Sequence, residues 1–140
     1  MVFKFYKYSA AGNDFILVNN SENDLPKGKR GLFAKNVCPR RISIGADGLI
    51  VVEKEDSIVS MDYYNADGSL GEGCGNALRS VAYFCNAYLS TENLITIKSL
   101  YDHHLAWVEE GLIRVEIFII EPNVREECIN ISGNLFEGYF

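Results

Sequence analysis

The chain has 140 residues, of which 48% are hydrophobic and 23% are charged, and its formal net charge is -6. This composition is typical of one soluble globular domain with enough apolar residues for a core. The acidic balance argues against a general nucleic-acid-binding surface, which needs clustered Lys and Arg. No stretch approaches the roughly 20 apolar residues of a membrane span. The N-terminal residues lack a basic start followed by an apolar run, so we expect no signal peptide and a cytoplasmic location.

Four cysteines are present, and none of them forms a CxxC pair: Cys38, Cys74, Cys85 and Cys128. Zinc sites usually show closer pairing of ligands, so we expect no metal site. We predict that His103 and His104 lie in a solvated turn. A disulfide framework is possible by count, but the reducing cytosol disfavours it, and we interpret all four cysteines as free thiols.

Short strands dominate the first half of the chain. The predicted elements up to residue 64 are a strand over 2–9, a strand over 15–18, a loop over 19–28, a weak helix over 29–37, a turn over 45–48 and paired strands over 49–53 and 58–64. Gly12 separates the first two strands, and Pro39 follows the weak helix.

The clearest element is a helix over residues 75–89, which follows a loop of turn residues at 65–73. Its apolar residues recur at helical spacing, and Arg79, Tyr83 and Asn86 fall on the opposite face. Beyond it we predict a strand over 94–99 and a hairpin formed by 105–108 and 113–119, whereas residues 123–140 alternate only weakly. Many short strands and one strong helix predict an α+β fold, in which a strongly curved, mostly antiparallel or mixed sheet wraps the central helix.

Cys74 is the strongest candidate for chemistry. It stands between Gly73 and Gly75 at the predicted start of that helix. The backbone N–H groups at a helix start are unpaired and carry partial positive charge, which stabilises a thiolate. The same N–H groups, on Gly75 and Asn76, can hold a carboxylate, and the flanking glycines let a ligand approach the sulfur. The other three cysteines lack this setting, and we interpret them as small buried apolar residues.

Three ordered motifs resemble those of the diaminopimelate epimerase family. They are Gly12-Asn13-Asp14-Phe15, then Gly45-Ala46-Asp47-Gly48-Leu49, and finally Asn65-Ala66-Asp67-Gly68-Ser69 followed by Cys74-Gly75-Asn76-Ala77-Leu78-Arg79. The likeness runs over essentially the whole chain, although it is weak after about Glu121. Proline racemases and phenazine-type isomerases share the fold, but racemases typically carry His at the position of Asn76, which favours the diaminopimelate branch.

The resemblance implies a cofactor-independent epimerase that converts LL- into meso-diaminopimelate for the synthesis of lysine and cell-wall precursors. Cys74 would be one of two thiol acid/base residues, and Gly75 and Asn76 would present backbone N–H groups to the substrate carboxylate. Asn65 would hydrogen-bond the substrate, and Asn13 would line the same pocket. For Asp14 and Asp67 a role in turns suffices, and Arg79 would fix the helix or a neighbouring loop.

The resemblance also implies that this chain is one half of a pseudo-repeat. Residues 1–120 would form the N-terminal domain, and residues 121–140 would begin the connection to an absent second domain. The second thiol would then come from a C-terminal half or from a second copy of this chain, since a twofold axis mimics the pseudo-repeat. A non-catalytic remnant or small-molecule-binding domain of the same fold is the alternative. A redox module is weaker, because no resolving cysteine lies near Cys74 in sequence.

Overall fold

A seven-stranded sheet forms the body of the protein. The computed structural model describes residues 2–89, 93–117, 126–131 and 134–139. The strands of the sheet lie in chain order: β1 (Tyr6–Ala10), β2 (Asn13–Asn19), β3 (Gly48–Glu55), β4 (Ile58–Asn65), β5 (Leu94–Lys98), β6 (His103–Glu109) and β7 (Leu112–Val115). A separate two-stranded sheet pairs β8 (Glu126–Ile131) with β9 (Asn134–Tyr139).

The direction of each strand pair follows from its connection. Strands joined by tight turns or short loops are antiparallel, whereas β2 and β3 are parallel because α1 (Lys27–Val37) lies between them in the chain. The pair β4 and β5 is parallel for the same reason, since α2 (Gly75–Phe84) connects them. The mixed sheet therefore confirms the predicted α+β class.

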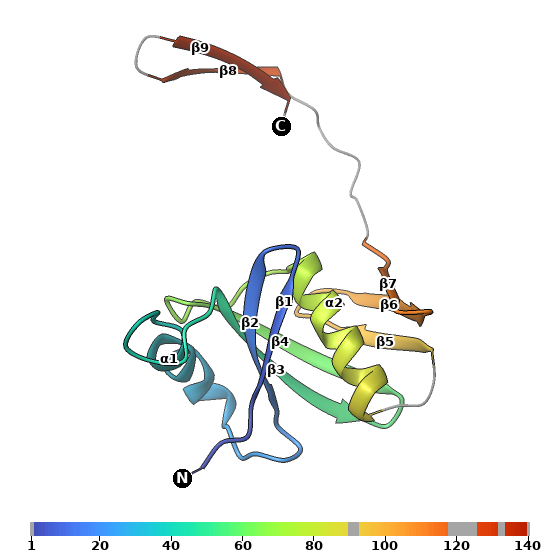
Figure 1. Cartoon of the computed structure of the whole chain (residues 1–140). Helices are drawn as coiled ribbons and strands as arrows, with labels where there is room; N and C mark the ends of the chain where they lie inside the picture. The colour runs from blue at the N-terminus through green and yellow to red at the C-terminus, as the bar shows by residue number, and fades with distance from the viewer. Residues whose placement is uncertain (1, 90–92, 118–125, 132–133, 140) are drawn as a thin grey trace.

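The sheet curves around α2 (Figure 1). This helix contacts β1 and β2 near one edge of the sheet and β5, β6 and β7 near the other, which requires the strands to wrap around it. Successive side chains of the central strands point to opposite faces of the sheet, so each face carries its own hydrophobic core. Phe15 and Leu17 face α2, whereas Ile16 and Val18 belong to a second cluster with Ala34 of α1. Each helix thus covers one face of the central strands, and α2 is the central helix that we predicted.

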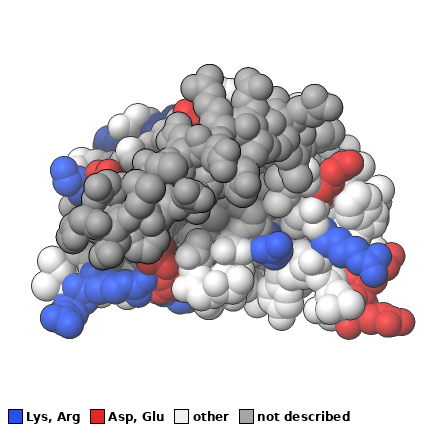
Figure 2. All heavy atoms as spheres, turned by 90° about the horizontal axis from the view of Figure 1, so that it is seen from above, with Lys and Arg blue, Asp and Glu red and all other residues white. Residues whose placement is uncertain are grey.

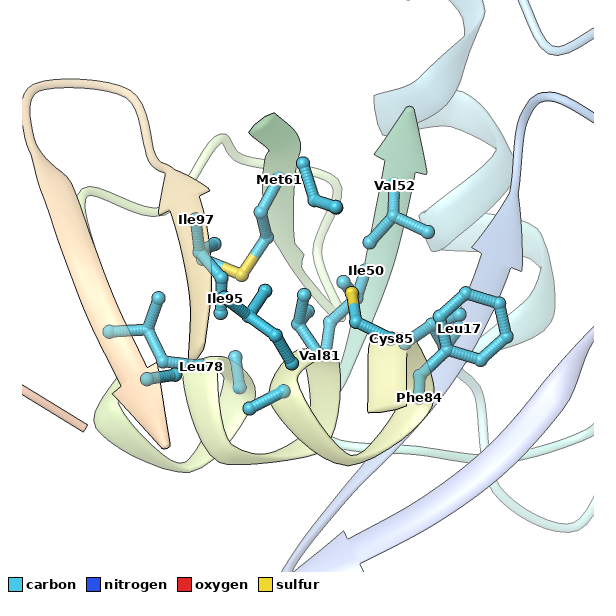
Figure 3. Packing of buried hydrophobic residues seen from close by; sticks show 14 of the residues in the cluster. Leu17, Ile50, Val52, Met61, Leu78, Val81, Phe84, Cys85, Ile95 and Ile97 are labelled. Atoms are coloured by element: carbon cyan, nitrogen blue, oxygen red, sulfur yellow. The ribbon is translucent and has the colours of Figure 1, made fainter. Parts of the chain in front are cut away.

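Figure 3 shows how the apolar stripe of α2 meets the sheet. The labelled side chains that gather between helix and strands are Leu17, Ile50, Val52, Met61, Leu78, Val81, Phe84, Cys85, Ile95 and Ile97. Phe84 is fully buried, and its ring lies 4.9 Å from that of Tyr6 in edge-to-face geometry. This packing explains why the amphipathic pattern was the most reliable signal in the sequence.

Four predicted elements need correction. The first strand begins at Tyr6 rather than at residue 2, because the Asn23 side chain binds both the N–H and the carbonyl of Lys4 and holds this segment against the loop after β2. The predicted helix over 75–89 ends as an α-helix at Phe84, and Cys85–Leu89 continue it as a π-helical turn. The predicted strands at 105–108 and 113–119 begin earlier, in β6 at His103 and in β7 at Leu112, and β7 ends at Val115.

The prediction of a solvated turn at His103 and His104 is wrong. Both residues lie in β6, and His104 is buried. Its Nε2 is 3.0 Å from the Ser99 hydroxyl, and its Nδ1 is 3.2 Å from the carbonyl oxygen of Glu116. The ring therefore crosslinks the end of β5 to the segment after β7. Sequence reasoning missed this role because both partners are set by strand pairing.

Helix α1 approaches the loop after β4 at a glycine–glycine contact. A Cβ on Gly31 would lie 2.5 Å from the carbonyl oxygen of Gly68, and a Cβ on Gly68 would lie 2.6 Å from that of Gly31. Gly68 also has a φ of 87°, a backbone conformation that residues with a side chain rarely adopt. This contact positions the 65–69 turn, which carries one of the family-like motifs.

Replacing Gly31 with alanine should lower the free energy of unfolding by about 1–3 kcal/mol, the usual cost of overpacking. Gly28 provides the matched control, because it lies in the same helix and a Cβ there meets nothing within 4 Å. Gly28→Ala should be neutral or stabilise the protein by up to about 1 kcal/mol. Urea unfolding of the two variants measures the difference, and equal stabilities would show that the Gly31–Gly68 contact does not constrain the fold.

Charges of both signs lie close together on the surface (Figure 2). On the face shown, basic and acidic side chains neighbour one another at several places around the rim. Two ion pairs at the surface join Lys4 to Glu22 and Arg40 to Asp47. Within the described ranges, no helix is both long and apolar enough to span a membrane.

Candidate functional site

The site begins where the loop after β4 enters α2. Cys74 is the N-cap residue, with an extended backbone at φ −154° and ψ 111°. The first hydrogen bond of the helix runs from the Leu78 N–H to the Cys74 carbonyl at 3.0 Å. The N–H groups of Gly75, Asn76 and Ala77 precede that bond, so they are the donors that a helix leaves open at its start. These include the N–H groups of Gly75 and Asn76, which we predicted would hold a carboxylate.

The Cys74 thiol is free and half-buried, and it packs against the core cluster beneath α2. It makes no capping hydrogen bond to the helix. The sulfur is thus held at a defined place but is not used to stabilise the helix. Partial exposure distinguishes Cys74 from the other free thiols, Cys38 and Cys85, which are 1% and 0% exposed.

Space around the helix start is limited on one side. A Cβ on Gly75 would lie 3.2 Å from Cδ1 of Ile117, so Ile117 borders the backbone that we expect to meet the substrate. The Arg79 guanidinium donates to the Asn76 side-chain oxygen at 2.6 Å, and the Ser80 hydroxyl donates to the Asn76 carbonyl at 3.0 Å. Arg79 therefore steadies the first turn, as the sequence suggested.

Asn65 lies at the end of β4 in a tightly bonded turn. Its Nδ2 donates to the Ser69 hydroxyl at 2.9 Å, and that hydroxyl donates to Asp67 at 2.6 Å. The Ser69 hydroxyl and backbone N–H lower the pKa of Asp67, which has the turn role that we predicted. The plane of the Asn65 amide is therefore fixed by its own loop. Substrate contact would add to this turn role.

Strand register connects Asn13 with Asn65. Asn13 begins β2, Phe15 pairs with Gly48 of β3, and Gly48 pairs with Asn65 of β4. The β1–β2 turn lies beside α2, because Ala10 and Ala11 of the turn and Arg79 of the helix line the same pocket of about 330 Å³. Figure 1 shows the β1–β2 turn next to the start of α2. Among the described residues, no hydrogen bond joins either asparagine to Cys74, Gly75 or Asn76.

Tyr63 is a residue of this region that sequence reasoning missed. Its ring lies against the backbones of Gly48 and Gly71, where a Cβ would collide with ring atoms, and it meets the Phe15 ring edge-on at 6.0 Å. Burial raises the pKa of Tyr63, and the charge of an ionised Cys74 nearby would add to the rise. Gly48 and Gly71 lie far apart in the sequence, so their shared contact with the Tyr63 ring becomes visible only in the folded structure.

No cluster of three potential metal ligands occurs within the described ranges. Another pocket of about 330 Å³ lies beside α1 and is lined by Phe3, Leu25, Phe33 and their neighbours. Cys74 lines neither this pocket nor the one beside Arg79.

Thiol labelling should distinguish Cys74 from the buried cysteines. Burial raises the pKa of Cys38, and it raises the pKa of Cys85 to about 12, so both remain protonated and shielded near pH 8. We expect iodoacetamide to modify Cys74 at least about tenfold faster than either of them. Peptide mapping by mass spectrometry reads each site, with the urea-unfolded chain as control. Equal rates in the folded chain would contradict the described burial. The prediction for Cys128 concerns a side chain outside the described part of the structure.

Comparisons with known proteins agree with the motifs. The family model described as diaminopimelate epimerase matches residues 5–117. The chain is 38% identical over 132 residues to the diaminopimelate epimerase of Flavobacterium psychrophilum, covering 94% of this chain and 49% of that protein. It is 46% identical over 134 residues to the enzyme of Methanocella arvoryzae, covering 93% of this chain and 48% of that protein.

The fold also matches solved structures at low sequence identity. A phenazine biosynthesis protein of the PhzF family from Enterococcus faecalis superposes with a TM-score of 0.65 and 17% identity, over 79% of this chain and 42% of that one. This likeness supports the architecture alone. The chain spans about half the length of the curated relatives that it matches. On the family model and these relatives, the chain belongs to the diaminopimelate epimerase family.

Proposed function

We propose that Cys74 is one of two thiol acid/base residues in a cofactor-independent epimerase that interconverts LL- and meso-diaminopimelate. The observation that carries the proposal is a free, half-buried thiol at the N-cap of α2, beside backbone N–H groups that precede the first helical bond. Family membership supplies the substrate class, since the matched relatives are named diaminopimelate epimerases. The reaction would serve synthesis of lysine and cell-wall precursors in the cytoplasm.

The chemistry explains why a thiol and a helix start belong together. Inversion at carbon requires removal of a proton on one face and delivery of another on the opposite face, by groups near hydrogen-bond reach. An amino-acid α-proton is very weakly acidic. The N–H groups of Gly75 and Asn76 would stabilise negative charge that develops on the adjacent carboxylate. Asn13 and Asn65 would bind the remainder of the substrate.

We infer that the second acid/base group comes from outside the described site. Cys38 and Cys85 are buried, and the thiol of Cys38 lies in the cluster on the opposite face of the sheet from α2. Because the matched relatives are about twice as long, a C-terminal half is the natural source. We propose that residues 121–140 begin the connection to it. A second copy of the chain is the other source, because twofold symmetry would place two Cys74 residues face to face.

The test follows conversion of LL- into meso-diaminopimelate by chiral chromatography over a range of chain concentrations. Calorimetric titration measures binding in parallel, and L-lysine, which lacks the second amino-acid end, is the control ligand. A rate per chain that rises with concentration would identify a self-paired site, and a constant rate per chain would show that pairing does not change over the concentrations tested. Binding without conversion would favour the binding-domain alternative or a missing half. Absence of both binding and conversion would contradict the proposal.

A further inference from the structure

Two aspartates from the family-like motifs bind each other's backbone across neighbouring parallel strands. Asp14 lies in β2, and Asp47 directly precedes β3. The Asp14 N–H donates to Asp47 Oδ2 at 3.0 Å. The Asp47 N–H donates to the Asp14 carbonyl at 2.9 Å and to Asp14 Oδ1 at 3.2 Å. This reciprocal contact fixes the starts of the two strands relative to each other, but it also brings two negative charges close together.

Arg40 compensates both charges with one side chain. Its Nη2 donates to Asp14 Oδ1 at 2.5 Å and to Asp47 Oδ1 at 2.8 Å, and its Nη1 donates to Asp14 Oδ2 at 3.1 Å. Lys7 forms a further ion pair with Asp14. The Arg40 guanidinium holds the pKa of Asp14 well below its usual range. A planar guanidinium suits this bridging geometry, whereas the point charge of a lysine does not.

The bridge lies beside both asparagines of the proposed site. Asn13 immediately precedes Asp14, and Gly48 immediately follows Asp47. Gly48 pairs with Asn65 across β3 and β4. A change in the distance between Asp14 and Asp47 would therefore change the distance between the two asparagines. Without Arg40, repulsion between the carboxylates would act on this distance, and Lys7 would neutralise only one of them.

We propose that Arg40 is a positioning residue that, by bridging Asp14 and Asp47, sets the spacing of Asn13 and Asn65 and thereby the affinity for the amino-acid substrate. The link to affinity rests on the function proposed above. Arg40 acts through the two aspartates, since three of its hydrogen bonds already go to their carboxylates. Its side chain is 56% exposed, so the ion pairs alone would add little to global stability.

The experiment compares Arg40→Gln with Arg40→Lys and Arg41→Gln in the ¹⁵N-labelled 140-residue chain. Arg41 is the matched control, because it is adjacent, exposed and outside every salt bridge among the described residues. In Arg40→Gln we expect faster hydrogen exchange at the Asp14 and Asp47 amides and shifted side-chain amide signals of Asn13 and Asn65. Arg40→Lys should recover part of these changes, and Arg41→Gln should leave them at wild-type values.

The same variants are titrated with diaminopimelate. Arg40→Gln should bind about tenfold more weakly than the wild type, the size of effect expected for a lost pair of coupled contacts. Unchanged amide exchange, or unchanged affinity in a wild type that binds, would overturn the positioning role and leave the proposed function standing. Absence of binding to the wild type, with the amide changes present, would instead refute the proposed function and confirm the bridge as structural only.

Discussion

Replacing Cys74 with alanine is expected to abolish exchange of the diaminopimelate α-proton while leaving the fold unchanged. A positioned general base contributes roughly 10²–10⁴-fold to a proton-transfer step, so removal of the thiol should reduce exchange by about that factor. The fold should persist because the Cys74 side chain makes no capping hydrogen bond and is only half-buried. NMR in D2O measures exchange, and circular dichroism with thermal unfolding measures the fold.

Cys38→Ala is the control variant, because it removes a thiol that is not part of the proposed site. Cys38 belongs to the core cluster on the other face of the sheet, with Ala34 and Tyr64. Its removal should lower stability but leave exchange per folded chain near the wild-type value. Full exchange in Cys74→Ala, with a normal fold, would show that another group is the base.

Replacing Arg30 with leucine is expected to cause the largest loss of stability among the variants considered. Arg30 is 2% exposed, and its guanidinium donates to Glu53 at 2.5 Å and also to Asp62. Burial tends to raise the pKa of Glu53, but hydrogen bonds from Asn20 and Arg30 outweigh burial and lower it. Leucine would leave two carboxylates without their cation. Because these are each 27% exposed, we expect a loss of about 2–4 kcal/mol, less than for a fully buried pair.

Lys29→Leu removes a neighbouring positive charge from the exposed surface of the same helix and should change stability by no more than about 0.5 kcal/mol. Urea unfolding of both variants gives the two free energies. Since α1 carries Gly31 against Gly68, loss of Arg30 should also loosen the turn that holds Asn65. A loss no larger than that in Lys29→Leu would mean that the Arg30 ion pairs do not hold α1 on the sheet.

Local patterns predicted the elements that dominate the fold. The stripe formed by Ala77, Leu78, Val81 and Cys85 needs nothing beyond helical spacing to be recognised, and all four residues are buried against the sheet. Helix continuation past Phe84 was predicted correctly in extent, but the change to π-helical bonding was not, because both forms keep the apolar residues on one side.

Long-range contacts account for what the sequence did not reveal. Alternation predicted a strand from residue 2, yet Phe3 packs against Phe33 of α1, with ring centroids 4.9 Å apart. The Cys74–Gly75–Asn76 segment could be recognised because all its features are contiguous. The Asp14–Arg40–Asp47 bridge could not, because it depends on the parallel register of β2 and β3.

The most direct test of the central claim is α-proton exchange of saturating diaminopimelate by the wild-type 140-residue chain in D2O. We predict loss of the α-proton signal in NMR without any added cofactor, at a rate that falls to background once Cys74 is alkylated with iodoacetamide. Bound diaminopimelate that keeps its α-proton in the unmodified chain, or exchange that survives complete alkylation of Cys74, would contradict the assignment of this thiol as the base.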